Sequence, residues 1–107
     1  MSKYGNKKTE IDGIIFHSKA EANRYLDLKC LERAGKIKNL VLQPRYDYKL
    51  NGKLIFFYKA DFKYFDVDLN REVIEDVKSK MTAKLSTYRL KKKLIEVNHN
   101  IQITEVF

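Results

Sequence analysis

The fold of this chain is decided by residues 58–80, which read YKADFKYFDVDLNREVIEDVKSK. Strand-like runs of apolar and aromatic side chains lie on both sides of a polar turn from Asp66 to Arg71, which is typical of two antiparallel strands. Two acids, Asp61 and Asp76, stand within these runs although the formal net charge of the chain is +8. Carboxylates inside half-buried strands need a physical reason, because burying a charge is costly unless something compensates it.

The alternation of side chains along a strand places Asp76 and Lys78 on one face of the sheet, and Glu75 and Val77 on the other. If the turn is centred between residues 68 and 69, Asp61 stands directly opposite Asp76, with side-chain origins about 5 Å apart. At an effective dielectric of about 20, two carboxylates at that distance repel by about 3 kcal/mol. Lys78 can neutralise one charge, whereas a hard divalent cation compensates both and prefers oxygen ligands. We therefore expect Asp61 and Asp76 to bind Mg²⁺, with Mn²⁺ as a substitute.

This interpretation assigns a phosphodiester as the substrate. Bound Mg²⁺ would polarise the phosphodiester and lower the pKa of a coordinated water, while Lys78 positions the nucleophile and holds the phosphate. Glu21 projects from a predicted helix along its apolar stripe, so it can reach the same sheet face as a third acid and metal ligand.

Outward from this hairpin, the sequence predicts the order helix, three strands, helix, strand. Ser18 begins a helix that runs to Ala34, with Glu21 as its capping-box partner and Gly35 as its stop. Residues 40–50 form one strand or two short ones, and Asn51-Gly52 predicts a hairpin turn into one long strand over residues 53–65. Residues 72–79 are expected to be the next strand, 82–97 the second helix and 101–107 the last strand. The fold class is α/β, of a mixed α+β kind.

Length and composition limit the class of protein. The 107 residues, 44% of them hydrophobic, are expected to form one domain over residues 11–107, preceded by a flexible basic arm over residues 1–10. No apolar run approaches the roughly 18 residues that a membrane span requires. The basic start is not followed by an apolar segment, so no export signal is expected. These features predict an intracellular, cytoplasmic protein that has no membrane partner.

The charge distribution favours a polyanionic partner. Lys and Arg number 22 against 14 Asp and Glu, and neutralising phosphates releases counterions. From Val77 to Ile95 the chain carries seven Lys or Arg residues and no acid. We expect this basic segment to contact the DNA backbone through Lys80, Lys84, Lys91 and Lys92.

Other interpretations of the same residues remain open. Asp76 and Lys78 could be an ordinary ion pair at a sheet rim, and Asp61 could form an ion pair with Lys59 or Lys63. The capping box by itself explains Glu21. The protein could then be a catalytically silent DNA- or RNA-binding module that uses the basic segment 78–93. A third alternative is an interaction protein that binds neither metal nor nucleic acid.

Asp61, followed by Asp76-Val77-Lys78 in this order of elements, resembles the PD-(D/E)XK nuclease superfamily. A closer resemblance, from Asp12 to Leu94, is to small phage and prophage proteins described as endonuclease or Holliday-junction-resolvase-like. It is carried by DGIIFHSKAEANRYLDLKCLERAGKIKNLVLQPRYDY, YKADFKYF, EDVKS and KLSTYRLKKKL.

The resemblance implies an αβββαβ core with a central mixed sheet flanked by helices, and Mg²⁺-dependent cleavage of duplex or branched DNA. Asp61, Asp76 and Lys78 match the metal-binding and catalytic signature, and Glu21 matches the acid that many members carry on the first helix. Ala60 replaces the signature proline, and Asp76 replaces the commoner Glu. A homodimer would supply two sites for cutting two strands.

Overall fold

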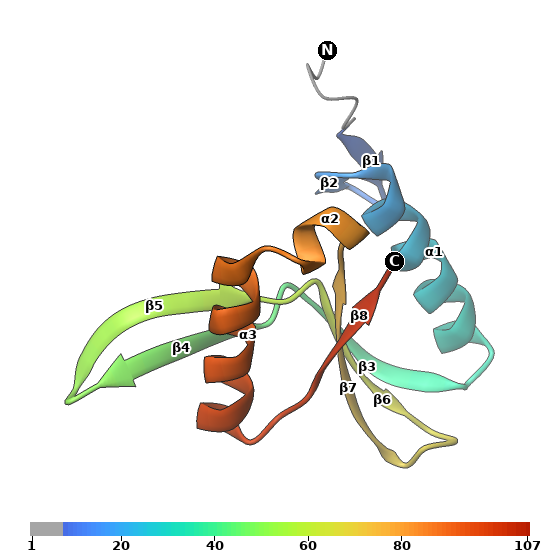
Figure 1. Cartoon of the computed structure of the whole chain (residues 1–107). Helices are drawn as coiled ribbons and strands as arrows, with labels where there is room; N and C mark the ends of the chain where they lie inside the picture. Colours follow the sequence, from blue (N-terminus) through green and yellow to red (C-terminus); the bar gives the residue numbers. More distant parts are fainter. Residues whose placement is uncertain (1–7) are drawn as a thin grey trace.

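The computed structural model describes residues 8–107, and Figure 1 shows a central sheet with helices packed against it. The sheet has the strand order β3-β6-β7-β8, in which β8 runs parallel to β7 and the other neighbours are antiparallel. Two separate hairpins, β1-β2 and β4-β5, flank this sheet. The elements are β1 (Thr9–Ile11), β2 (Ile14–Phe16), α1 (Lys19–Arg33), β3 (Ile37–Leu42), β4 (Arg45–Leu50), β5 (Lys53–Lys59), β6 (Phe62–Asp66), β7 (Arg71–Val77), α2 (Lys80–Ala83), α3 (Ser86–His99) and β8 (Ile103–Val106).

The predicted fold class is confirmed, because the chain forms a mixed α+β structure around a mixed sheet. When the two hairpins and the short α2 are set aside, the order α1, β3, β6, β7, α3, β8 is the predicted helix, three strands, helix, strand. The part of the predicted arm that falls on residues 1–7 lies outside the described residues. Thr9 and Glu10, which that prediction also assigned to the arm, belong to β1.

The first helix begins and ends where its local signals predict. The Ser18 hydroxyl oxygen accepts a hydrogen bond from the backbone N–H of Glu21 at 3.1 Å, which satisfies one of the free donors of the first turn. Gly35 follows the helix with a φ of 75°, a left-handed conformation that glycine adopts without strain. Ala22, Tyr25 and Leu28 are buried by the helix against the sheet.

The second predicted helix is wrong as one element, because residues 82–97 fall into two helices. Ser79 caps α2 by accepting a bond from Thr82 N–H at 3.1 Å, and α2 ends after one turn. The N–H of Leu85 then bonds to the carbonyl of Thr82, a tight turn that separates α2 from α3. Asn100 ends α3 in a left-handed conformation with a φ of 53°.

The predicted long strand over residues 53–65 is also wrong. It divides at Ala60 and Asp61 into β5, which pairs with β4, and β6, which belongs to the central sheet. The neighbouring segment divides at the same level, at Gln43 and Pro44, into β3 and β4. Two backbone bonds brace these breaks: Ala60 N–H donates to the Pro44 carbonyl at 3.1 Å, and Gln43 N–H donates to the Asp61 carbonyl at 3.0 Å. The hairpin therefore leaves the sheet at Asp61.

The predicted register of the central hairpin is confirmed. Phe62 pairs with Glu75 and Asp66 pairs with Arg71, so the turn over residues 67–70 is centred as expected. The Asp61 N–H donates to the Glu75 carbonyl at 3.0 Å, which continues the pairing one step beyond β6. Asp61 therefore arrives beside Asp76.

The sheet separates two apolar cores. Phe62 and Tyr64 face α1 in one core, and Ile74, Ile95 and Tyr58 lie between the sheet, α3 and the β4-β5 hairpin in the other. None of the helices formed by residues 8–107 combines the length and the apolar character needed to cross a membrane.

Candidate active site

Asp61 and Asp76 meet at the end of β7, where the β4-β5 hairpin leaves the sheet. One Asp61 carboxylate oxygen, Oδ2, accepts the Val77 N–H at 2.7 Å. Asp76 is fully buried, with 0% of its surface exposed, and its Oδ2 accepts a hydrogen bond from the Tyr58 hydroxyl. Among the residues that the structure describes, Asp76 Oδ1 has no hydrogen-bond partner although it is buried. An orphaned carboxylate oxygen of this kind is costly unless a proton or a cation compensates it.

Lys78 lies on the same face of β7 as Asp76, as the alternation predicts. Its Nζ stands 3.4 Å from Asp76 Oδ1 and 5.2 Å from the centre of the Tyr88 ring. The alternative of an ordinary ion pair is correct to the extent that this contact exists. It is not a rim pair, however, because the Asp76 side chain is buried and one ammonium at 3.4 Å leaves Oδ1 without a properly oriented donor.

The surroundings raise the proton affinity of these carboxyl groups. Burial is the main cause that raises the pKa of Asp76 to about 7, and the charge of Asp61 acts in the same direction. The hydrogen bond from Tyr58 and the charge of Lys78 oppose this rise. Burial also raises the pKa of Asp61, against the lowering effect of its bonds to Asp76 and Val77 N–H. The two carboxyl groups are thus arranged to share a proton when no cation is present.

Glu21 reaches this site from α1. Glu21 is 8% exposed, and it lines a pocket of about 240 Å³ together with Gln43 and Asp61. Burial, followed by the charge of Asp76, raises its pKa, which Lys78 partly offsets. The backbone half of the predicted capping box is present, but within residues 8–107 the Glu21 carboxylate makes no hydrogen bond back to Ser18. The structure therefore brings Glu21 to the pocket rather than using it only as a cap.

The two aspartates carry the donors that a hard divalent cation prefers, which are carboxylate oxygens, one of them without a partner. In residues 8–107, no three acidic, His or Cys side chains are gathered closely enough to hold a metal ion together. Glu21 therefore does not complete a three-acid cluster in this arrangement. Mg²⁺ commonly binds through one or two carboxylates, with waters and substrate phosphates as the remaining ligands. The pair Asp61 and Asp76 fits such a site.

Two tyrosines belong to the site although neither was predicted from the sequence as a site residue. Tyr58 crosses from β5 to donate to Asp76, and the Tyr88 hydroxyl on α3 donates to Glu105 Oε2 at 3.1 Å. Burial raises the pKa of both hydroxyls, so both keep their protons at neutral pH. Nothing in the local pattern distinguishes Tyr58 from the other aromatic residues of β5, because the contact depends on the break at Ala60.

The opposite face of β7 is held to α1 by a partly buried ion pair. Arg24 Nε and Nη2 donate to Glu75 Oε1 and Oε2 at 2.8 and 2.6 Å, and Tyr64 also donates to Oε2. Glu75 faces the side of the sheet opposite to Asp76, as the predicted alternation requires, and it is 2% exposed. Because Arg24 follows Glu21 by less than one helical turn, this pair fixes the end of α1 that carries Glu21.

Arg24→Met is expected to lower the free energy of unfolding by about 3 kcal/mol, because it leaves the Glu75 carboxylate buried and unpaired. Chemical denaturation measures this loss. The double variant Arg24→Met with Glu75→Met removes both charges and should be more stable than Arg24→Met alone. A loss below about 1 kcal/mol in Arg24→Met, the value of a surface pair, would contradict this role.

The side chains predicted to contact the DNA backbone lie in different environments. Three of them are exposed: Lys80 on α2, Lys84 directly after α2, and Lys91 on α3. Lys92 is partly buried, with its Nζ 3.8 Å from both Glu96 and Glu105. A phosphate contact by Lys92 would have to compete with these two carboxylates.

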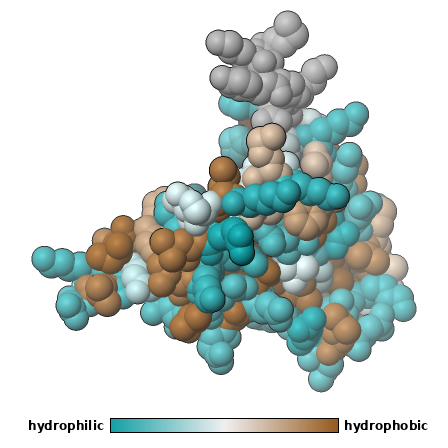
Figure 2. Space-filling model, viewed as in Figure 1, coloured by the Kyte–Doolittle hydropathy of each residue, from teal (hydrophilic) through white to brown (hydrophobic). Residues whose placement is uncertain are grey.

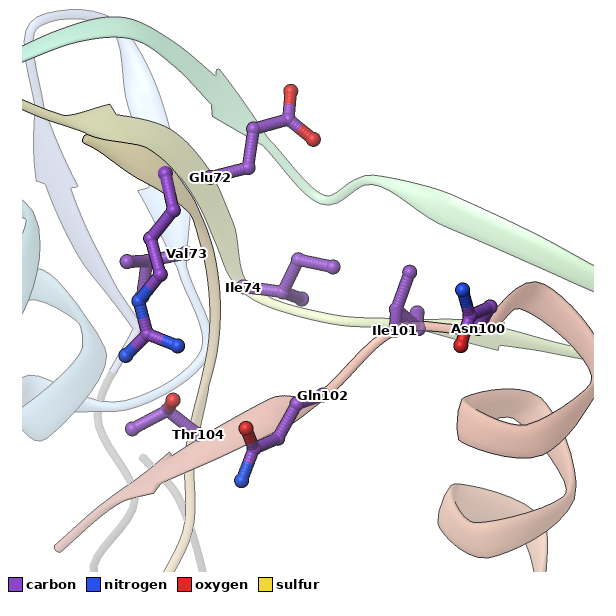
Figure 3. Close-up of a pocket in the computed structure, with 8 residues that line it drawn as sticks. Glu72, Val73, Ile74, Asn100, Ile101, Gln102 and Thr104 are labelled. Carbon is purple, nitrogen blue, oxygen red and sulfur yellow. The ribbon is translucent and has the colours of Figure 1, made fainter. Parts of the chain in front are cut away.

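A second pocket, of about 260 Å³, opens at the other end of β7 (Figure 3). Thr104, Gln102 and Asn100 supply polar groups to it, whereas Glu72 points away from Thr104 and Gln102. None of its lining residues belongs to the site of Asp61 and Asp76. This pocket is therefore separate from the one that Glu21, Gln43 and Asp61 line.

Comparison with known proteins identifies a family without indicating an activity. A family model described as protein of unknown function (DUF1064) matches residues 1–106. No curated protein and no solved structure matches the chain significantly.

Proposed function

The chain belongs to the family described as protein of unknown function (DUF1064), and we propose that it is a metal-dependent DNA endonuclease. The observation that carries this proposal is the pair of carboxylates formed by the half-buried Asp61 and the buried Asp76, in which one Asp76 oxygen lies beside Lys78 and has no hydrogen-bond partner among residues 8–107. Paired acids with a lysine two residues after the second are the pattern by which the sequence resembles the PD-(D/E)XK nucleases. Branched DNA is the first substrate to test, because the resemblance implies it.

In this proposal each residue has a defined task. Asp61 and Asp76 hold Mg²⁺ or Mn²⁺, which when bound polarises the phosphodiester and lowers the pKa of a water. Lys78 stabilises the charge that develops on the phosphate oxygens and orients the nucleophile. Glu21 lines the space in which the phosphate and water would lie, and it can accept a proton from that water. Tyr58 orients Asp76 through its hydroxyl.

The test uses supercoiled plasmid and a four-way DNA junction, each incubated with Mg²⁺, with Mn²⁺ and with chelator. The wild-type protein should cut at least one of them only when a divalent cation is present. Lys78→Met should slow cutting by about 10²-fold, the usual effect of losing one charge-stabilising group. Lys36→Met, which changes an exposed lysine between α1 and β3 that is not among the predicted DNA contacts, is the matched control.

The second candidate function is a catalytically silent nucleic-acid-binding module. It is favoured by one observation, that no three ligand-type side chains are gathered in the described part of the chain. In that case the wild-type protein binds DNA and leaves it intact with every cation. If Lys78→Met instead cuts DNA as fast as the wild type, the cutting comes from a contaminating nuclease.

A further inference from the structure

The β4-β5 hairpin is a two-stranded ribbon that extends away from the central sheet (Figure 1). One of its faces packs on α3 through Tyr46, Tyr48, Phe56 and Tyr58. These residues pair across the two strands, Tyr46 with Tyr58 and Tyr48 with Phe56. Because side chains alternate along a strand, the residues between them point to the opposite face of the ribbon. The two faces of the hairpin therefore have different tasks.

The outer face presents cations on an aromatic ring. The Arg45 guanidinium lies 4.0 Å from the centre of the Phe57 ring, and Lys59 Nζ lies 5.9 Å from it. Phe57 is a large apolar side chain that remains 48% exposed. Residues 45–59 hold four Lys or Arg and one acid, Asp47, which pairs with Arg45 at 2.8 Å. The ribbon thus carries an excess of positive charge, and among residues 8–107 the Arg45–Asp47 contact is the one ion pair that its basic side chains make.

The tip of the hairpin combines the same charge with exposed apolar groups. Leu50 and Leu54 flank the Asn51-Gly52 turn and are 54% and 48% exposed. Lys49 and Lys53 stand next to them in the sequence and are exposed too. Figure 2 shows apolar residues gathered over the hairpin and α3, with hydrophilic residues at the tip. Apolar side chains beside cations suit the sugars and base edges that lie between phosphates.

The base of the ribbon leads directly to the candidate active site. A backbone hydrogen bond of 3.1 Å, from Ala60 N–H to the Pro44 carbonyl, closes the base of the ribbon. The neighbouring residues Gln43 and Asp61 line the pocket together with Glu21. A polyanion bound along the hairpin would therefore pass close to Asp61.

We propose that the β4-β5 hairpin is a DNA-binding arm, which contacts duplex DNA through Lys49, Lys53 and Lys59 and through the apolar tip. A two-stranded ribbon has the dimensions to enter the major groove. A second copy of the chain is the less favourable occupant, because two bodies of net charge +8 repel whereas phosphates attract the ribbon. This inference rests on the proposed function, from which it takes DNA as the ligand.

The experiment measures binding of a labelled 20-base-pair duplex in chelator, so that no cutting is needed, over a series of salt concentrations. The variant Lys49→Ala, Lys53→Ala, Lys59→Ala should weaken binding at least about tenfold and reduce the salt slope by about 2 to 3. The matched control Arg33→Ala, Lys36→Ala, Lys38→Ala removes the same charge from exposed positions at the end of α1 and the start of β3. It should change both quantities much less.

A further variant, Leu50→Ser with Leu54→Ser, tests the tip. It should weaken binding severalfold and leave the salt slope unchanged, because no phosphate contact is lost. Equal losses in the hairpin variant and the control would overturn the arm. The proposal would also be overturned if the wild-type protein does not bind the duplex. It would be overturned too if the protein is a dimer that Leu50→Ser with Leu54→Ser dissociates while DNA binding stays unchanged. DNA binding that depends on the hairpin lysines, without any cutting, would reject the nuclease proposal and support the DNA-binding arm. Cutting that is unchanged in the triple lysine variant would support the nuclease proposal and reject the arm.

Discussion

Asp76→Asn is expected to lower the rate of metal-dependent DNA cleavage by at least about 10³-fold. The substitution keeps the shape of the side chain and can still accept the Tyr58 hydroxyl, but it removes the charge that holds the cation. A bound metal ion contributes several kcal/mol to stabilising the charge of the transition state, and about 4 kcal/mol corresponds to 10³ in rate. Initial cutting rates on plasmid or junction, at saturating Mg²⁺, measure the loss.

Asp68→Asn is the matched control. Asp68 stands in the exposed turn between β6 and β7, and within residues 8–107 its side chain makes one loose contact, with Lys36 at 3.8 Å, so this variant should cut at the wild-type rate. DNA binding separates lost catalysis from misfolding, because a folded Asp76→Asn should bind DNA as well as the wild type, or more tightly once one negative charge is removed. An Asp76→Asn protein that cuts within tenfold of wild type would exclude Asp76 as a metal ligand.

The free energy of unfolding, measured in chelator, is expected to fall as the pH rises from about 4 to about 7. In the folded protein burial raises the pKa of Asp76 from 3.8 to about 7, so between these values the folded state holds a proton that the unfolded state has released. Stability therefore decreases with increasing pH in this window, by up to about 1.4 kcal/mol per pH unit for one group. Asp61 and Glu21 contribute in the same direction, since burial raises the pKa of each.

At pH 7 and above, Mg²⁺ should restore the stability that was lost between about pH 4 and pH 7, because it binds the ionised carboxylates of the folded state only. At 100 times its dissociation constant, a ligand stabilises by about 2.7 kcal/mol. Asp76→Asn should be less dependent on pH than the wild type and should not respond to Mg²⁺. Denaturant titrations at several pH values, with Mg²⁺ and with chelator, measure both effects. A wild-type stability that rises over this pH range and ignores Mg²⁺ would mean that Lys78 alone compensates the pair.

The pairing of the candidate catalytic residues could be predicted from the sequence because it depends on short-range geometry. The turn over residues 67–70 sets the register of β6 and β7, and alternation then places Asp61, Asp76 and Lys78 together. The capping of α1 by Ser18 is equally local. Each of these features involves a few neighbouring residues or one hairpin.

The remaining features of the site involve residues that are distant in the sequence. The hydrophobic pattern of residues 53–65 is continuous, and only the bonds of Gln43 and Pro44 to Asp61 and Ala60 reveal that the strand changes sheet there. The contact of Tyr58 with Asp76 follows from that change. The predicted third acid is at the pocket, but its distance from the pair depends on how Arg24 and Glu75 dock α1 on β7.

The sequence by itself determined the order of the core elements, the register of the central hairpin and the meeting of two acids with a lysine. Alternation, turns and caps decide these properties, since each depends on the backbone geometry of adjacent residues. The tertiary structure alone decided that Asp76 is fully buried, with one oxygen that has no hydrogen-bond partner among residues 8–107, and that a basic ribbon leaves the sheet at Asp61. Burial and the division of a strand depend on which distant segments pack together, and local propensity carries no information about that choice.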